Sequence, residues 1–183
     1  MSDLVKGMLV GAGALMLFLL VLGGGLAALG AFSVAADEPA GALADMVLPF
    51  VREQAIDARA DDIGVPRLDD AVMIAEGAEH YEAMCTGCHL APGMGENEMR
   101  PGMNPKPPLL ARMPAEEPAE QFWIVKHGIA MTGMPAWGVT HSDTEIWNIV
   151  AFLQKLPRLT PEQYRALVKS TSGQHDHEHH DHD

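Results

Sequence analysis

The middle of the chain is too rich in proline and glycine to form a helix or strand of ordinary length. Residues 86–118 hold seven of the 13 prolines and four of the 18 glycines. Such a density of turn-forming residues predicts a long loop. Helical patterns flank this loop, and the apolar–polar alternation typical of a strand occurs nowhere. We therefore expect an all-α fold, in which loops this long leave the helices unable to fill a core unaided.

The helix before the loop runs directly into the only two cysteines of the chain. Asp69 or Asp70 can cap it, and its apolar side chains share one face at helical spacing as far as Cys85. After the loop, a helix restarts at Pro118, which is tolerated at a first helical position, and Gly128 stops it.

Two further helices complete the pattern. The stretch "HSDTEIWNIVAFLQKLP" opens with a capping box of Ser142 and Glu145, and its wide apolar stripe predicts a buried helix. Residues 159–170 repeat the Thr-x-x-Gln form of the box and predict a short final helix. We expect one helical domain over residues 68–158, then this helix, then a disordered His/Asp-rich tail over residues 171–183.

The N-terminal segment has the polarity of a transmembrane helix. Residues 7–36 contain no charge, and as a helix they would run about 45 Å, more than the roughly 30 Å hydrocarbon core of a bilayer. The alternative is a cleaved signal peptide, since "SVAADE" offers small residues for cleavage, but signal h-regions are usually about 7–15 residues. We expect an uncleaved anchor, followed by a spacer over residues 37–67 in which Met46 to Ala60 can form a short amphipathic helix near the membrane.

The flanks of this segment predict its orientation. Lys6 precedes it, while Asp37 and Glu38 follow it, which favours an N-terminus inside and an exported remainder. The expected location is the bacterial inner membrane, crossed once, with the domain on the periplasmic or outer side. A net charge of -13 argues against nucleic acid as a partner. That charge either steers the domain toward a basic protein or merely aids solubility.

Cys85, Cys88 and His89 lie within five residues, and four kinds of site compete for them. A disulfide is possible in an exported protein but would enclose only two residues. A thioredoxin-like redox pair expects a βαβ context, and zinc expects four ligands, so neither pattern is complete. Covalent haem attachment is signalled directly by C-x-x-C-H and is the interpretation we favour.

A second axial ligand for haem iron would come from one of twelve methionines. Met134 lies between Gly133 and Pro135 in "IAMTGMPAWG", where glycine allows close backbone approach and proline stiffens the chain. We expect Met134 to be the ligand. Met131, three residues earlier, is expected to be core filler or an exposed loop residue.

The chain resembles a class I c-type cytochrome, close to the monohaem domains related to the third subunit of high-affinity haem-copper oxidases. The residues that carry the resemblance are "GAEHYEAMCTGCHLAPG", "MNPKPPLL", "FWIVKHGIAMTGMPAWG" and "EIWNIVAFLQKLP". It implies that His89 is the proximal and Met134 the distal ligand of one haem c, and that the carbonyl of Pro108 orients His89. It also implies that Gly77 and Tyr81 pack against Trp147 or Phe152.

The surroundings of the haem are expected to be apolar. Trp123 and Trp137 are expected to bind the cofactor, together with Ile124, Leu109 and Leu110, and to favour the reduced state by excluding water. His80 and His127 are expected to lie at the surface or at a helix end and not on the iron.

The expected function is single-electron transfer without enzymatic activity, between a respiratory donor and a terminal oxidase or reductase in the membrane. The alternative is a haem protein that handles or senses metals. It rests on the tail, whose imidazoles are of a kind that binds copper, nickel or zinc. The tail histidines are His175, His177, His179, His180 and His182.

Overall fold

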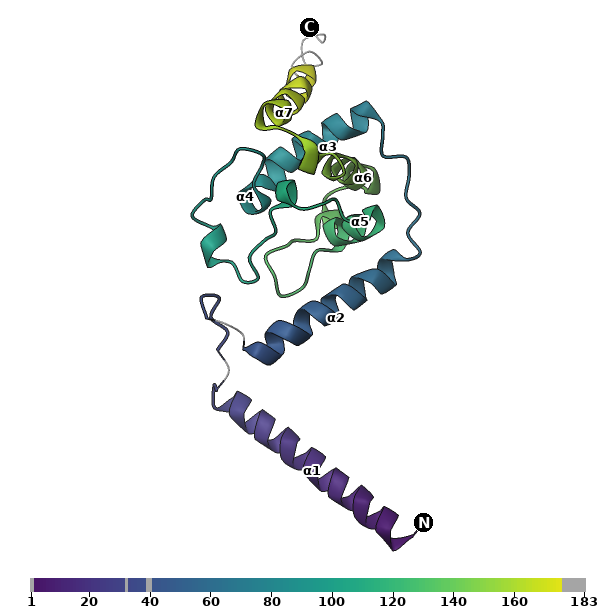
Figure 1. The fold of residues 1–183 in the computed structure, drawn as a ribbon, viewed down its shortest axis with the longest axis vertical. Coiled ribbons are helices and arrows are strands. Elements are labelled where there is room, and N and C mark those ends of the chain that lie inside the picture. The colour runs from purple at the N-terminus through teal and green to yellow at the C-terminus, as the bar shows by residue number, and fades with distance from the viewer. Residues whose placement is uncertain (1, 32, 39–40, 176–183) are drawn as a thin grey trace. The chain divides into compact units, whose positions relative to one another are not determined.

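The computed structural model describes residues 2–31, 33–38 and 41–175, and within these ranges it contains helices and no strand. The chain divides into two compact units, Met1–Ala42 and Leu43–Asp183. This confirms the predicted all-α fold class. The helices, drawn in Figure 1, are α1 (Asp3–Ala28), α2 (Ala42–Ala60), α3 (Ala71–Met84), α4 (Thr86–His89), α5 (Pro118–His127), α6 (Asp143–Leu153) and α7 (Pro161–His175).

The first unit consists of the apolar helix α1. It has a mean hydropathy of 2.3 over its most apolar window, has no buried side chain, and is long and apolar enough to cross a membrane. The helix begins at Asp3 and ends at Ala28, whereas the charge-free segment in which we expected the anchor is residues 7–36. The expectation followed the absence of charge, which marks an apolar segment but not the ends of a helix.

The second unit begins earlier than the sequence suggested. Residues 37–67 were expected to be a spacer, but α2 occupies much of that range and buries Ile56 and Ala60 in the unit. Only the C-terminal half of α2 contains buried side chains. Pro49 lies inside the helix, where proline removes one backbone hydrogen bond.

The packing of α3 against α6 forms the centre of the second unit (Figure 1). Asp70 caps α3 by accepting hydrogen bonds from the backbone N–H groups of Val72 (2.8 Å) and Met73 (3.2 Å). Gly77 lies where the two helices meet, since a Cβ there would be 1.9 Å from the carbonyl oxygen of Asn148. The ring of Tyr81 lies 5.2 Å from that of Phe152, which confirms the expected pairing of these helices.

The remaining helices start and stop largely where their capping residues predict. The capping box of Ser142 and Glu145 opens α6, and the apolar stripe of α6 is buried as expected. Trp147 stacks on Phe122 of α5, with ring centroids 4.2 Å apart, and so joins α6 to α5. The last helix, α7, runs to His175 and is longer than the predicted residues 159–170.

The long loop contains no helix of ordinary length, as predicted. It holds only α4 and two short 3-10 turns, Arg100–Gly102 and Leu110–Arg112. The loop supplies several residues between Met103 and Glu116 to the wall of a cavity.

Candidate cofactor site

The helix α3 positions the two cysteines at the site. Cys85 is its C-terminal cap, and α4 follows at once as a single turn. Within this turn the backbone N–H of Cys88 donates to the carbonyl of Cys85 (3.1 Å), and the N–H of His89 donates to the same oxygen (2.8 Å). The two sulfurs and the imidazole are therefore held on one short, helical segment.

The imidazole of His89 is fixed by the loop. Its Nδ1 lies 2.9 Å from the carbonyl oxygen of Pro108, which is the contact that the resemblance implied. Because a carbonyl only accepts, Nδ1 carries the hydrogen, and Nε2 of the neutral ring is left with a free lone pair. Burial lowers the pKa of His89, the hydrogen bond to Pro108 opposes this, and the charge of Arg100 adds to the lowering. The neutral ring, which is the form that ligates metals, is thus favoured.

The two cysteines are free thiols and are partly buried, so the disulfide alternative is not what the structure contains. Burial, followed by the effect of Cys88, raises the pKa of the Cys85 thiol to about 12. A thiol with so high a pKa is protonated at neutral pH and is a poor nucleophile, unlike the thiols of redox enzymes. Among the described residues, no three His, Cys, Asp or Glu side chains gather as a zinc site would require.

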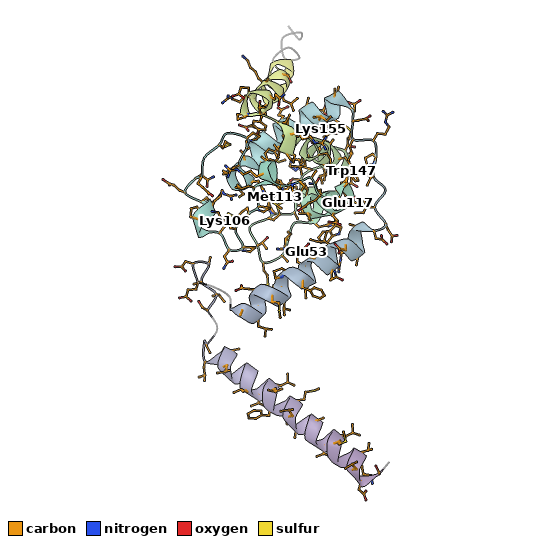
Figure 2. The ribbon with its side chains drawn as sticks, viewed as in Figure 1. Glu53, Lys106, Met113, Glu117, Trp147 and Lys155 are labelled. Atoms are coloured by element: carbon orange, nitrogen blue, oxygen red, sulfur yellow. The ribbon has the colours of Figure 1, made fainter. Side chains whose placement is uncertain are left out.

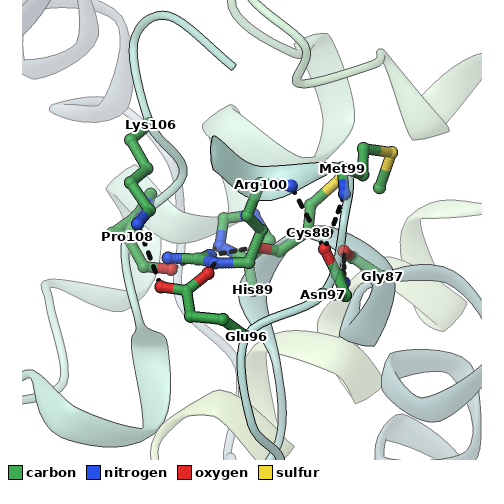
Figure 3. Close-up of polar contacts among 9 residues, drawn as sticks. All are labelled: Gly87, Cys88, His89, Glu96, Asn97, Met99, Arg100, Lys106 and Pro108. Carbon is green, nitrogen blue, oxygen red and sulfur yellow. Dashed lines mark hydrogen bonds and ion pairs between the residues drawn. The ribbon is translucent and has the colours of Figure 1, made fainter. Parts of the chain in front are cut away.

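A polar cluster from the loop braces the cysteine turn (Figure 3). The amide of Asn97 donates to the carbonyl of Gly87 (2.7 Å), and its oxygen accepts from the backbone N–H groups of Met99 and Arg100 (both 3.1 Å). The guanidinium of Arg100 donates to the carbonyl of Cys88.

The charge of Arg100 is almost fully buried, with 2% of the residue exposed. It is paired with Glu96 at 3.1 Å, and Glu96 also accepts from Lys106 at 2.9 Å. Sequence reasoning missed this cluster, since Asn97 and Arg100 stand in a segment whose composition indicates only a loop.

A cavity of about 610 Å³ lies beside His89. This volume is within the range of about 300–1,000 Å³ that is typical of small-molecule and cofactor sites. Its walls come from α2, the long loop, α5 and the segment before α6, and Figure 2 labels three of the side chains concerned, Glu53, Lys106 and Met113. Apolar lining residues include Ile56, Leu110, Ile124, Val125, Ile129 and Leu153.

Met134 lines the same cavity as His89, although the two are far apart in the sequence. The turn that carries it is tight, since Gly128 has a φ of +66° and a Cβ there would lie 2.7 Å from the carbonyl oxygen of Met134. Thr132 stabilises the turn by accepting from the N–H of Met134 at 3.1 Å. Met131 is fully exposed (100%) and lies outside the cavity, whereas Met103 and Met113 also line it.

Three of the residues expected around the cofactor do not line this cavity. Trp123 and Trp137 are not among the residues that line the cavity, and neither is Leu109. Trp123 instead lies against the ring of His127 (5.0 Å), and Trp137 packs on the core with its ring 5.5 Å from that of His141.

Four of the five tail histidines lie outside the residues that the structure describes. His175 is the last described residue, at the end of α7. The histidines at positions 177, 179, 180 and 182 lie outside the described residues.

The residues present fit a covalently attached haem. Two thiols stand one helical turn apart on the segment that ends at His89, the neutral ring of His89 has Nε2 available, and Met134 lines the same cavity as His89. This donor set is that of a c-type haem site with His/Met ligation.

The comparison with protein families gives the same result. The family described as cytochrome c oxidase, cbb3-type, subunit III matches residues 72–153, which run from the second residue of α3 to the last of α6. No curated protein and no solved structure matches the chain. Residues 72–153, which are 82 of the chain's 183 residues, thus match a c-type haem-binding domain of the cbb3-type subunit III family.

Proposed function

We propose that this protein is a membrane-tethered single-electron carrier whose haem c is attached through Cys85 and Cys88 and ligated by His89 and Met134. The observation that carries the proposal is that His89, which directly follows Cys88 in the chain, and Met134 line one cavity. Haem c supplies a reversible one-electron ferric/ferrous couple, and Met/His ligation gives it a raised reduction potential.

The side chains have separate tasks in this proposal. The sulfurs of Cys85 and Cys88 hold the cofactor, so that it does not dissociate between electron-transfer events. Pro108 fixes the ring of His89 and its tautomer through the 2.9 Å contact at Nδ1, which leaves Nε2 for the iron. Met134 would supply the second ligand to the iron, and an iron ligated by both His89 and Met134 would suit outer-sphere electron transfer and not catalysis on a bound substrate.

The charges around the cavity act in opposite directions on the potential. The apolar wall excludes water and disfavours the more charged oxidised state, which raises the potential. Three carboxylates, Glu53, Glu116 and Glu120, also line the cavity and lower the potential, whereas Arg52 and Lys106 raise it.

The apolar helix α1 supports a membrane location. By length and composition it can cross a bilayer once and hold the second unit at the surface. The charge on its flanks favours the outer side for that unit. We propose that the electron donor is a respiratory complex or dehydrogenase, and that the acceptor is a terminal oxidase or reductase in the same membrane.

Replacement of Met134 by His tests the ligation. The variant is expected to keep its covalent haem in a pyridine haemochrome assay, to lose the weak red band of Met-to-ferric-iron charge transfer, and to show a lower midpoint potential. Met103→Leu and Met113→Leu serve as matched controls, because both side chains line the cavity and are expected to leave the band in place. Loss of the band in Met103→Leu, with Met134→His unchanged, would move the ligand to Met103.

A further inference from the structure

The helix α2 has two halves with opposite surroundings. Its C-terminal half buries Ile56 and Ala60 and contributes Arg52, Glu53 and Ile56 to the cavity wall. Its N-terminal half, residues 42–51, buries no side chain and contains Asp45 as its single charge. The family match begins only at residue 72, so α2 lies outside the part of the chain that the family accounts for.

The N-terminal half exposes an apolar stripe. Its members follow the i, i+3, i+4, i+7, i+8 spacing of a helix face that is normally buried. They are Leu43 (72% exposed), Met46 (67%), Val47 (40%), Phe50 (65%) and Val51 (54%), and Leu48 (63%) lies beside them. A contiguous apolar surface of this kind marks a contact with lipid or with another protein.

The position of the stripe in the chain favours lipid. The helix α1 ends at Ala28 and α2 begins at Ala42, so residues 29–41 connect them. Those 13 residues (41 − 29 + 1) span at most about 47 Å even when fully extended. A helix tethered this closely to a membrane span meets the bilayer surface at high effective concentration, without having to find a partner.

The distribution of charge along α2 also favours contact between the apolar stripe and lipid. The charged residues Arg52, Glu53, Asp57 and Arg59 all belong to the C-terminal half, which is the half that packs on the second unit. The half with the apolar stripe contains only one charged residue, Asp45, so its contact with lipid would remove little charge from water. Such a helix lies in the plane of the interface, with its apolar face about 5–10 Å into the boundary between headgroups and acyl chains.

We infer that the apolar stripe of α2 (Leu43, Met46, Val47, Phe50 and Val51) inserts into the lipid interface and docks the second unit on the bilayer. The inference rests on the proposed membrane tether. Because the same helix forms part of the cavity wall, docking would hold the cofactor at a fixed distance from the membrane. That arrangement suits an electron partner that is itself embedded in the membrane.

Photo-crosslinking of the full-length, haem-loaded protein in phosphatidylcholine vesicles tests the inference. A benzoylphenylalanine side chain is placed singly at Phe50, at Leu17 of α1, or at Val139, which is an apolar residue of the second unit with 83% exposure. Mass spectrometry then measures the lipid adduct on each peptide. We expect adducts at positions 17 and 50, with the yield at 50 at least about five-fold above that at 139.

Two substitutions test whether the lipid adduct at position 50 depends on the apolar stripe. Val47→Glu places a charge in the stripe and is expected to lower the yield at position 50, whereas Gln54→Glu in the packed half leaves it unchanged. An unchanged haem spectrum shows that each variant is folded.

The possible outcomes separate the two proposals. An adduct at position 17 without one at 50 overturns the docking inference, leaves the anchor intact, and assigns the stripe to a protein surface. An adduct at 50 without one at 17 supports docking and contradicts the transmembrane anchor. The absence of both contradicts the anchor and the docking together.

Discussion

Replacing Gly77 by alanine should test the packing that positions the cysteine turn. A Cβ at this position would lie 1.9 Å from the carbonyl oxygen of Asn148 and 2.9 Å from the Cβ of Phe152, whereas real Cβ contacts stay above 3.0 Å. The helices α3 and α6 would therefore have to separate by at least 1.1 Å (3.0 − 1.9). The obstacle is backbone inside a helix and cannot swing aside as the end of a flexible side chain can.

The magnitude follows from two opposing effects. Overpacking of a well-packed core costs about 1–3 kcal/mol and occasionally more, and the backbone obstacle places this case at the upper end. Alanine in place of glycine in a helix gains about 1 kcal/mol. The net loss of unfolding free energy is about 2 kcal/mol, and at about 3–5 °C per kcal/mol for a unit of this size the melting temperature falls by about 6–10 °C.

The measurement is thermal and urea unfolding of the haem-loaded protein, followed by circular dichroism and by haem absorbance. Because α3 leads directly into Cys85, we also expect a lower haem content per protein in the haemochrome assay. Gly102→Ala is the matched control, since a Cβ at Gly102 meets nothing within 4 Å and should leave both readouts unchanged. If Gly77→Ala melts within about 1 °C of the wild type and holds a full complement of haem, α3 and α6 do not cross as closely as described.

Three further perturbations test other contacts. Asp70→Ala removes the cap of α3 and should cost about 1 kcal/mol in urea unfolding, while Asp70→Ser should restore most of it; equal stability of all three proteins would contradict the cap. Asn97→Ala removes the hydrogen bond to the carbonyl of Gly87 and should cost about 1–2 kcal/mol and reduce haem attachment, which unfolding and the haemochrome assay measure; an unchanged protein would show that the brace does not contribute. Burial, with the charges of nearby carboxylates, raises the pKa of Glu120, so its charged form destabilises the folded state at neutral pH. Glu120→Gln should therefore raise the urea midpoint at pH 7, and the gain should vanish toward pH 4 as the wild-type carboxyl takes up its proton; a gain that persists at pH 4 would contradict this.

The sequence by itself determined the features that depend on neighbouring residues. Caps and stops are local, so Asp70, Pro118, Gly128 and the box at Ser142 indicated where helices begin and end to within a residue or two. The C-x-x-C-H motif is equally local, because one helical turn suffices to hold its three side chains. Hydrophobicity alone marked α1, although not its ends.

The tertiary structure decided what depends on residues that are distant along the chain. It assigned the C-terminal half of α2 to the second unit, because the burial of Ile56 comes from contacts that no local pattern of α2 reveals. It brought Met134 onto the cavity and left Met131 exposed, although the two lie in one short turn. It also braced the cysteine turn with Asn97 and Arg100. In each case the energy lies in packing and hydrogen bonds between separate segments, and these form only when the whole unit is folded.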